Sequence, residues 1–379
     1  MVATLALIAA LGGFDVREFE RARVVAAAEA ALANEPRSIT SAVNPRSAGG
    51  PHDFSSEGDY WWPDPANPGG PFIRRDGMTN PENFTAHRLL MIGMARDVGA
   101  LAAAYDLTRE ERYAGAAVRH LRAWFVDEAT RMNPDLRFAQ AIKGVTDGRG
   151  IGIIDTVHLT EVALAVDALR GSGALTAADD AAITGWFREY LHWLRTHPNG
   201  IEESRATNNH GTCWLLQTAA FARLTGDGEA LVMCRDGLIN DLLPNQMAAD
   251  GSFPREMART KPYGYAIFNL DAVCALATVL STPSENLMAH ALADGRGPVR
   301  GVEFLAPFLA DKSKWPLPPD VMYWDDWPIR QHALIFGALA SGREDWLSIW
   351  KSLPPDSAVA EVQRNTIVRF PTLWLRHRD

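Results

Sequence analysis

From residue 86 almost to the C-terminus, apolar residues recur three and four positions apart, the spacing that places them on one face of an α-helix. The alternating pattern of half-buried strands bounded by hairpin turns is nearly absent. This periodicity restricts the chain to an all-α fold. The predicted helices span residues 15–34, 86–105, 110–126, 155–169, 177–196, 211–224, 228–243, 264–280, 329–340 and 345–352.

A weak internal repeat relates three of the turns between these helices. The turns fall near residues 108, 225 and 341, which lie 117 and 116 residues apart, and each joins an aromatic-bearing helix to a partner helix. Helix hairpins of this kind bury their apolar faces only by stacking on neighbouring hairpins. The pattern predicts an α/α toroid, an incomplete α/α barrel of helix hairpins, in a single domain over residues 1–379. A plain helical bundle is the alternative.

Residues 35–84 differ from the rest of the chain, because Pro and Gly are frequent and little regular structure is expected. The segment nevertheless contains clustered aromatic and cationic residues, namely Tyr60, Trp61, Trp62, Arg74 and Arg75. Solvated linkers contain few aromatic residues, and long ordered loops usually serve a function. We therefore predict a long irregular N-terminal arm that offers these side chains to a cleft. The alternative is that the rings only anchor the arm.

Composition narrows the possible partners. Hydrophobic residues make up 47% of the chain and charged residues 22%, as in an ordinary globular protein. A net charge of −9 argues against nucleic acid as a partner, since phosphate binding needs a basic surface, but it leaves room for a local basic cleft. Cys213, Cys234 and Cys274 lie far apart in apolar helical contexts, so we expect neither a disulfide framework nor a cysteine metal site.

The first 14 residues form an apolar run that is too short to cross a bilayer. Its length and small residues suit the core of a signal peptide, but no Lys or Arg precedes it, so a first helix is equally compatible with it. A periplasmic or secreted location is one expectation, and a cytoplasmic location is the other. No later run is expected to be long and apolar enough for a membrane helix, so we expect no membrane partner.

A polar run, TNNHGTCW, occupies residues 207–214, where a loop is predicted to become an apolar helix. Asn and Thr favour helix starts because their side chains accept hydrogen bonds from the unpaired N–H groups of the first turn. Such a start would aim Asn208, Asn209 and His210 from a rigid base, as a binding or catalytic site requires. Taken alone, the run is equally well explained as a capped helix with a structural histidine.

A second polar group follows in an irregular loop before the helix predicted over 264–280. It supplies Arg259, Lys261, Tyr263 and Tyr265. Each of these alone could be an interface tyrosine or a solvated charge. Together with the earlier Asn-Asn-His run they provide amide donors, cations, an imidazole and a phenol, with no obvious carboxylate pair or metal cluster.

This set of groups suits β-elimination from a uronic-acid polymer. The C5 proton is removed, charge builds on the C6 carboxylate and the C4 oxygen leaves. Amide or cationic donors stabilise the developing charge, while a base accepts the C5 proton and an acid protonates the leaving oxygen. In mannuronate or glucuronate both atoms lie on one face, so one tyrosine can serve as base and acid. In guluronate they lie on opposite faces, and His210 could be the base.

Three features together resemble the alginate lyase superfamily: the Asn-Asn-His helix start, the Arg259…Tyr265-x-x-Phe268 segment, and the early Tyr-Trp-Trp-Pro-Asp-Pro…Arg-Arg-Asp-Gly…Asn-Pro-Glu run. The chain most resembles polysaccharide lyase family 38, whose members act on glucuronan or alginate, and resembles family 5 more distantly. The resemblance implies an α/α toroid that cleaves a 1,4-linked polyuronate by β-elimination with neither metal nor cofactor.

The resemblance also implies roles for individual residues. Asn209 would neutralise the substrate carboxylate, His210 would be the base or an orienting group, and Tyr265 would be the catalytic phenol. Arg259 lies one residue closer to this tyrosine than in the family 5 pattern. Tyr263 competes with Tyr265 for the role of the phenol, and cationic groups nearby would help that phenol to ionise.

The remaining candidates are predicted to bind the sugar units of an acidic polysaccharide through aromatic stacking and through amide or cationic contacts to carboxylates. They are Tyr60, Trp61, Trp62, Arg74, Arg75, Gln140, Lys143, Asn208, Lys261, Tyr263 and Trp324. Trp324 belongs to an aromatic run, residues 323–327, that resembles a sugar-stacking rim.

Two other functions compete with the lyase. A glycoside hydrolase on the same architecture would use Asp155, Glu161 or Asp325 as acid and base. A non-catalytic polysaccharide-binding protein would use only the aromatic arm. The fold alone does not decide among them.

Overall fold

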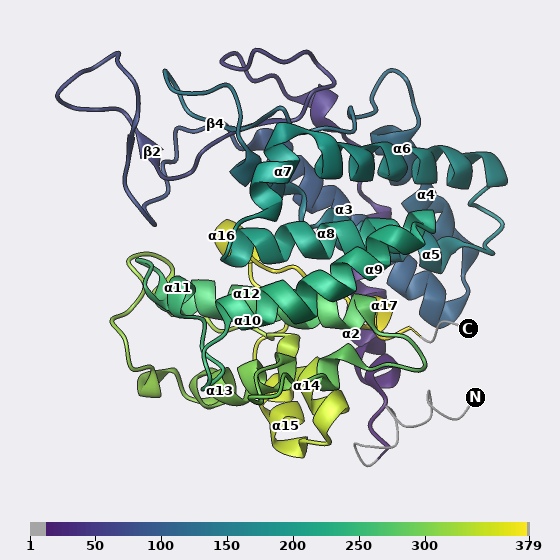
Figure 1. The fold of residues 1–379 in the computed structure, drawn as a ribbon. Coiled ribbons are helices and arrows are strands. Elements are labelled where there is room, and N and C mark those ends of the chain that lie inside the picture. Colours follow the sequence, from purple (N-terminus) through teal and green to yellow (C-terminus); the bar gives the residue numbers. More distant parts are fainter. Residues whose placement is uncertain (1–12, 377–379) are drawn as a thin grey trace. The chain divides into compact units, whose positions relative to one another are not determined.

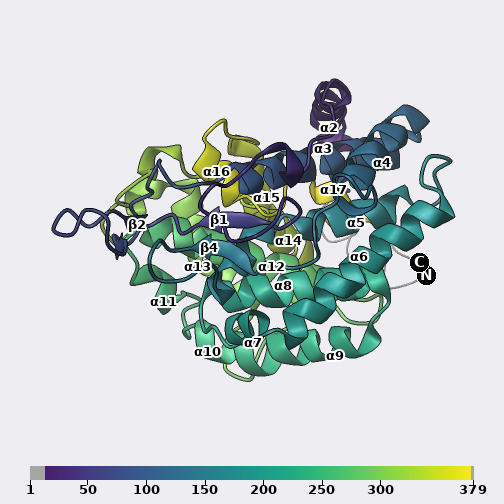
Figure 2. The same cartoon turned by 90° about the horizontal axis from the view of Figure 1, so that it is seen from above.

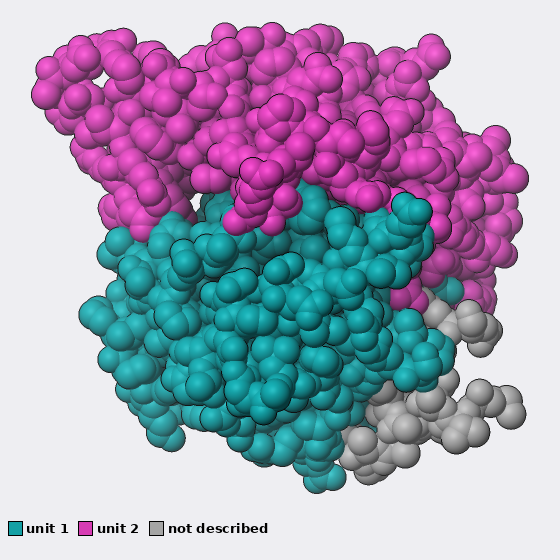
Figure 3. All heavy atoms as spheres, in the orientation of Figure 1, with its two compact units in different colours: residues 1–18, 206–219, 228–379 teal, residues 19–205, 220–227 magenta. Residues whose placement is uncertain are grey.

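The structure of the protein is a computed structural model that describes residues 13–376. Within this range the chain divides into two compact units (Figure 3). Unit 1 comprises the described residues within Met1–Glu18, Ala206–Ala219 and Gly228–Asp379, and unit 2 comprises Phe19–Arg205 and Ala220–Asp227. A single domain over residues 1–379 was predicted from the sequence, and the division into two compact units leaves that a prediction. The possible signal-peptide core at 1–14 lies almost wholly outside the described residues.

Unit 2 is built mainly from helices around an aromatic core. Its central helix, α3 (Ala86–Thr108), packs against α4 (Glu111–Phe125) and α5 (Leu159–Leu169), as Figures 1 and 2 show. The rings of Trp186 and Phe125 lie 4.7 Å apart, and other rings of the same cluster continue the contact. The other elements are most of α2 (Val16–Leu32), η1 (Ile39–Ser41), η2 (Gly150–Thr156), α6 (Ala177–Thr196), α7 (Pro198–Ser204) and the end of α8 (Asn209–Thr225).

Unit 1 is organised around α12 (Pro262–Leu280), which packs against α13 (Pro298–Ala310) and α14 (Ala333–Ser341) (Figure 1). The helix is apolar on nearly every face because neighbours cover it all round. The other elements are the start of α8, α9 (Gly228–Asp236), the π-helix η3 (Gly237–Leu242), α10 (Leu243–Gln246), α11 (Pro254–Met257), η4 (Leu287–Ala289), η5 (Lys312–Lys314), η6 (Trp324–Asp326), α15 (Glu344–Ser352), α16 (Ala360–Arg364) and α17 (Pro371–Trp374).

By length and composition, α12 could also cross a membrane, so the prediction that no run after residue 14 is long and apolar enough is wrong. Of its most apolar window, 83% is buried inside the protein. The core helix of a protein without any membrane contact meets the same criterion, so this single helix is weak evidence for a membrane span.

The helix hairpins predicted from the repeat are present as α3–α4, α8–α9 and α14–α15. Each has a residue with positive φ where its first helix ends: Arg109 at 61°, Gly226 at 73° and Gly342 at 74°. These positions lie 117 and 116 residues apart, the spacing of the sequence repeat. A left-handed residue here is the common way to end a helix and reverse the chain, and glycine adopts it without steric cost.

The irregular arm predicted over 35–84 contains only short regular elements, and it is ordered by side-chain contacts. Strand β1 (Ser55–Glu57) pairs in parallel with β4 (Phe138–Ala141) (Figure 2), while β2 (Trp61–Trp62) pairs antiparallel with β3 (Ile73–Arg74). The side chain of Asn83 donates to the carbonyl oxygens of Gly58 and Trp61, at 2.7 and 3.2 Å. These bonds replace the backbone pairing that the segment lacks.

Helix boundaries follow the predictions closely where polar caps are strong. Helix α6 spans the predicted 177–196, and Thr176 caps it by accepting from the N–H of Asp179. The sequence pattern did not predict helix α13, because Pro298 and Pro307 indicate helix breaks. Pro298 occupies the first turn, where its missing N–H costs no hydrogen bond, and Pro307 is tolerated inside the helix near its end.

A buried carboxyl group joins two core helices of unit 1. Asp271 of α12 accepts the backbone N–H of Ala333, at 2.8 Å, at the start of α14. Burial raises the pKa of Asp271 to about 7, although hydrogen bonds from the backbone of Ala333 and His332 act in the opposite direction. The folded state therefore binds a proton here more tightly than the unfolded chain does.

We predict that Gly226→Ala lowers the free energy of unfolding by about 1 kcal/mol, because a Cβ disfavours the left-handed backbone. No atom lies within 4 Å of the added Cβ, so the cost is conformational and not steric. Gly185→Ala inside α6 is the matched control, since its Cβ also meets open space, and it should stabilise by up to about 1 kcal/mol. The denaturant midpoints of unfolding of the two variants check both predictions. Equal midpoint shifts of the same sign would contradict a conformational cost specific to the left-handed Gly226.

We predict that Asp271→Asn flattens part of the pH dependence of stability. The folded-state pKa of about 7 lies above the ordinary 3.8, so the contribution of this group is fully present below 3.8 and is lost as pH rises towards 7. Relative to the variant, the parent should lose up to about 1.4 kcal/mol per pH unit in that window. Urea unfolding between these pH values measures the difference, and a constant difference would contradict the prediction.

Candidate active site

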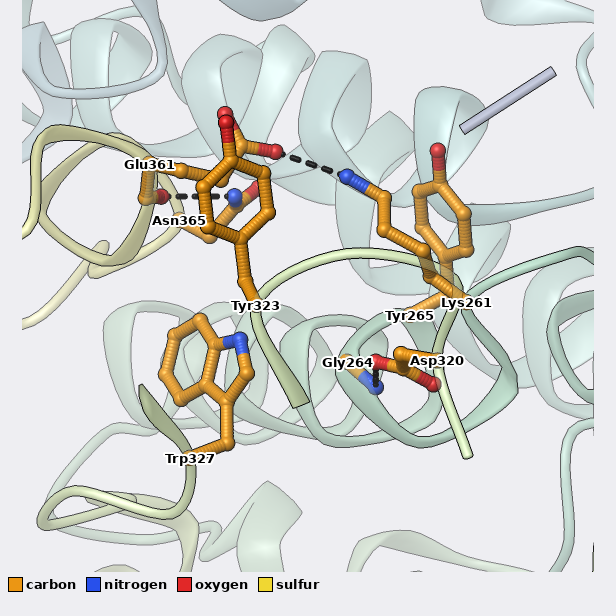
Figure 4. Close-up of a pocket in the computed structure, with 8 residues that line it drawn as sticks. All are labelled: Lys261, Gly264, Tyr265, Asp320, Tyr323, Trp327, Glu361 and Asn365. Atoms are coloured by element: carbon orange, nitrogen blue, oxygen red, sulfur yellow. Dashed lines mark hydrogen bonds and ion pairs between the residues drawn. The ribbon is translucent and has the colours of Figure 1, made fainter. Parts of the chain in front are cut away.

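A small pocket in unit 1 collects polar and aromatic side chains from three separate parts of the chain (Figure 4). They come from the start of α12, from the loop before α14, and from α16 and the residue that follows it. The lining residues are Lys261, Gly264, Tyr265, Asp320, Tyr323, Trp327, Glu361 and Asn365.

The first turn of α12 sets the geometry of this pocket. Pro262 begins the helix, and the carboxylate of Asp320 accepts the N–H groups of Tyr263 and Gly264 at 2.9 and 2.8 Å. Burial raises the pKa of Asp320, while these two N–H donors act against that rise. A carboxylate at a helix N-terminus also interacts favourably with the helix dipole. The turn that carries Tyr265 is therefore fixed from a loop more than fifty residues away.

Tyr265 is half-buried and is paired with Arg259. The Arg259 Nη2 donates to the Tyr265 Oη at 3.1 Å, and the guanidinium carbon lies 4.2 Å from the centre of the tyrosine ring. A cation that donates to a phenol oxygen stabilises the phenolate more than the phenol. The structure thus brings together the cation and the phenol that the sequence motif suggested, despite their shorter spacing.

Tyr263 occupies a different environment from Tyr265. Its side chain is fully buried, and its Oη donates to the carbonyl oxygen of Phe308 at 3.1 Å. Its ring meets Trp315 and Trp324 edge-on, at 5.2 and 5.4 Å. Burial raises the pKa of Tyr263 well above its usual range. The hydroxyl and the ring of Tyr263 are thus used within the core, and its roles as catalytic phenol or sugar-binding residue stay predictions.

Lys261 is buried, with 6% of its surface exposed, and does not extend freely towards a ligand. Its Nζ forms an ion pair with the Glu361 Oε1 at 2.8 Å. Burial by itself lowers the pKa of Lys261, but the charges of Glu361 and Tyr265 outweigh it and the pKa is raised. Lys261 thus forms a buried ion pair at the pocket, and the direct sugar contact predicted for it stays a prediction.

The aromatic run 323–327 contributes residues other than the predicted Trp324. Tyr323 and Trp327 line the pocket, whereas the Trp324 ring packs against Tyr263. The Nζ of Lys312 donates to the carbonyl oxygens of Trp324 and Trp327, at 2.7 and 2.9 Å, and so fixes the turn. Tyr323 has φ of 66°, a conformation that bulky residues seldom adopt and that is often found at functional sites.

Asn209 begins α8, two residues before the predicted start at 211, and its amide already has a partner. Its backbone N–H and its Nδ2 donate to the two carboxylate oxygens of Glu256, both at 2.6 Å. Asn209 is buried, while the adjacent His210 is half-buried. Burial raises the pKa of Glu256, and the bonds from Asn209 and the charges of Arg259 and His210 oppose that rise. Glu256 therefore links the Asn-His pair electrostatically to Arg259.

A buried amide holds the start of α8 in place. The Gln246 Oε1 accepts from the Thr212 hydroxyl at 3.0 Å and from the Asn269 Nδ2 at 3.1 Å, and its Nε2 donates to the Asn208 carbonyl oxygen at 3.0 Å. The side chain of Asn208 accepts the N–H of His210 at 3.2 Å. Asn208 thus caps the start of α8. The sequence pattern predicted a sugar contact for Asn208, and that sugar contact stays a prediction.

Most of the other predicted sugar-binding residues belong to unit 2, where cations lie over aromatic rings. Arg149 lies over Trp61 at 5.8 Å and Arg75 over Trp62 at 5.3 Å, each measured to the ring centre. The side chains of Tyr60, Trp61 and Trp62 are partly exposed, and those of Arg74, Arg75 and Lys143 are exposed; the Lys143 Nζ lies 5.5 Å from the ring centre of Phe72.

Gln140 differs from these residues because it is buried and fully engaged. Its Oε1 accepts from Arg149 at 3.0 Å and its Nε2 donates to Asp155 at 3.2 Å. The sugar contact predicted for Gln140 stays a prediction. Asp155 also accepts from the Ser56 hydroxyl at 2.5 Å and pairs with Arg88 at 3.2 Å.

Several residues at the candidate site were not predicted to act there, among them Glu256, Asp320, Tyr323, Trp327 and Glu361. The run that contains Tyr323 was visible in the sequence, and Glu256 lies three residues before Arg259. Glu361 lies 100 residues from its partner Lys261, so no local pattern could identify it. Among the described residues, no group of three or more His, Cys, Asp or Glu side chains is arranged to hold a metal ion.

Comparison with known proteins identifies the family. Residues 38–315 match the family model described as alginate lyase. The structure is similar to that of an alginate lyase from Bacteroides ovatus, with a TM-score of 0.80, 30% sequence identity and 96% of each chain covered. No match was found among curated proteins.

Two more distant similarities bear on the fold alone. Alginate lyase A1-III from Sphingomonas species A1 matches with a TM-score of 0.52 and 17% identity over 85% of each chain. A variant of alginate lyase A1-III in complex with a tetrasaccharide matches with a TM-score of 0.55 and 15% identity, over 88% of this chain and 83% of the other. The similarities confirm the predicted all-α fold class of the α/α toroid. The chain belongs to the alginate lyase family and is a polysaccharide lyase.

Proposed function

We propose that this protein cleaves an alginate-type, 1,4-linked polyuronate by β-elimination, with Tyr265 as both base and acid. The observation that carries the proposal is the pairing of Arg259 with Tyr265, in which a cation donates to the phenol oxygen of a half-buried tyrosine in a pocket. A phenol held in this way can exist as phenolate, which is the form that a general base requires.

In the proposed reaction, the Tyr265 phenolate takes the proton from C5 of the sugar. The electron pair of the broken C5–H bond forms the C4=C5 double bond, and the bond from C4 to the glycosidic oxygen breaks. The phenol then gives its proton to the leaving oxygen, which restores the phenolate. Arg259 stays hydrogen-bonded to the phenol oxygen and limits the change in charge there.

Asn209 is proposed to act on the sugar carboxylate, where negative charge develops as the C5 proton leaves. His210 is proposed as an orienting group, or as the base if the sugar is guluronate. One N–H of the Asn209 side chain is donated to Glu256. The side-chain amide nitrogen carries a second N–H, which is proposed to donate to the sugar carboxylate. The carboxylate of Glu256 accepts from both the backbone and the side chain of Asn209, which fixes the direction of that amide. A fixed donor stabilises developing charge better than a mobile one.

The substrate class follows from the family and from the charge of the exposed residues. The relatives are named alginate lyases, and one was studied with a tetrasaccharide bound. The cations and partly exposed aromatic rings of unit 2 suit a chain of negatively charged sugars. Glucuronan is the second candidate polymer, through the resemblance to family 38, and the action is proposed to need neither metal nor cofactor. A periplasmic or secreted location is proposed with cytoplasmic as the alternative.

The hydrolase alternative finds less support. Asp155 and Glu161 are both buried, and Asp155 is held in a network with Ser56 and Arg88. Asp325 is exposed and lies in unit 1, whereas the other two lie in unit 2. A purely binding function does not explain why a cation is hydrogen-bonded to the pocket phenol.

Ultraviolet absorbance of the unsaturated sugar end tests the reaction. The protein is incubated with polymannuronate, polyguluronate, glucuronan or a neutral glucan, each with a chelator present. We expect absorbance to rise on a polyuronate and not on the glucan. New reducing ends without absorbance would contradict elimination and support hydrolysis. Activity that is lost with the chelator and restored by a divalent metal would contradict the metal-independent mechanism.

We predict that Tyr265→Phe lowers kcat by about 10² to 10⁴-fold, because the variant lacks the group that transfers the proton. Tyr263→Phe is the matched control, since it removes the hydroxyl of a tyrosine two residues away. That hydroxyl donates to a backbone carbonyl oxygen. It should lower stability by about 1 kcal/mol and leave kcat within a few-fold. Initial rates with the preferred polymer measure both effects. A large loss for Tyr263→Phe with activity retained by Tyr265→Phe would reverse the assignment.

A further inference from the structure

The pocket contains a buried ion pair that the proposed reaction does not use directly. The Lys261 Nζ and the Glu361 Oε1 lie 2.8 Å apart, and each side chain has only 7% of its surface exposed. The other carboxylate oxygen of Glu361 is 3.3 Å from Arg364 Nη1. Buried ion pairs of this kind often add little to stability, because removing two charges from water costs about as much as their attraction returns. Stability alone therefore does not explain why the ion pair is present.

The position of the pair points to the tyrosine rings. The Lys261 Nζ lies 5.5 Å from the centre of the Tyr265 ring and 5.4 Å from that of Tyr323. In the view of Figure 4 the ammonium lies between the two rings, and both phenol oxygens point to the same side. A cation at about 4 to 6 Å from an ionisable group favours the charged form of that group.

We propose that the Lys261–Glu361 pair is a positioning pair that sets how readily Tyr265 gives up its proton. This inference rests on the proposed function and adds an electrostatic control to it. Lys261 supplies positive charge to the phenol, and Glu361 keeps that lysine protonated and fixed in a site from which water is largely excluded. The raised pKa of Lys261 agrees with this arrangement, because the charges of Glu361 and Tyr265 favour the protonated lysine.

The other charges near Tyr265 come from several elements. Arg259, on the loop before α12, donates to the phenol oxygen, and Glu256 and His210 lie in the electrostatic neighbourhood of that arginine. Asp320 and Tyr323 line the same pocket from the loop before α14. From α16, Glu361 faces Lys261, and Arg364 contacts Glu361 from its other side. Lys261 and Arg259 are thus both placed over the Tyr265 ring.

The signs of the expected changes follow from these positions. Lys261→Met removes the cation, so the phenolate loses stabilisation and the ionisation midpoint of Tyr265 should rise by about 1 pH unit or more. Arg364 still contacts Glu361 in this variant, so the carboxylate keeps a partner. Lys261→Met combined with Glu361→Gln removes both charges, and its midpoint should lie between those of the parent and Lys261→Met.

The test is a spectrophotometric titration of tyrosinate in the full-length protein. The titration difference between each protein and its own Tyr265→Phe derivative isolates the ionisation of Tyr265. The double variant keeps the test decisive if Lys261→Met does not fold, since a neutral pair of similar volume is often tolerated at such sites. Lys261→Arg keeps the cation and should leave the midpoint near that of the parent.

Glu303→Gln is the matched control, because Glu303 pairs with Arg300 on the exposed surface of α13 and should not move the midpoint. The rising limb of kcat/KM against pH should follow the same order as the titration midpoints. A midpoint that is unchanged in Lys261→Met and in the double variant would overturn the inference. An upward shift in Lys261→Arg as large as that in Lys261→Met would also overturn it, because charge would then not be the cause.

The two claims fail in different ways. If the parent produces no unsaturated sugar, the proposed function fails, while the titration still decides whether the pair controls the phenol. If the parent is a lyase and the Tyr265 midpoint does not respond to removal of the Lys261 charge, only the inference fails.

Discussion

The candidate site depends on how the first turn of α12 is held. Two carboxylates from distant parts of the chain act on it: Asp320 accepts two backbone N–H groups of the turn, and Glu361 pairs with the lysine just before it. A helix start has N–H groups without partners inside the helix, so it needs such acceptors when it is buried. Because both are supplied by tertiary contacts, the position of Tyr265 depends on the folded unit as a whole.

The same turn places two tyrosines in different environments. Residues two positions apart on a helix point about 200° apart, since each residue advances about 100°. Tyr263 and Tyr265 therefore cannot both face the pocket, and the structure places Tyr263 in the core and Tyr265 beside Arg259. The sequence could predict that only one of them acts. It could not predict which one, because that depends on what covers each face.

Much of the fold was predictable because it rests on local periodicity and turn chemistry. The repeat spacing of 117 and 116 residues reappears in the positive-φ residues Arg109, Gly226 and Gly342. Contacts across long separations were not predictable. Glu361 meets Lys261 from 100 residues away, and no spacing rule connects them. In the aromatic run after residue 322, the pattern identified the segment, but only packing decided which rings face the pocket.

A crystal structure of the Tyr265→Phe variant with a bound mannuronate oligosaccharide tests the central claim most directly. We predict that the C5 hydrogen of one sugar points to the ring edge where the missing hydroxyl would lie. C5 should lie within about 2.6 to 3.2 Å of the position of the missing oxygen. The carboxylate of that sugar should contact Asn209 or His210. A sugar bound with its C5 hydrogen directed away from residue 265, or with its carboxylate elsewhere, would contradict the assignment of Tyr265 as the group that transfers the proton.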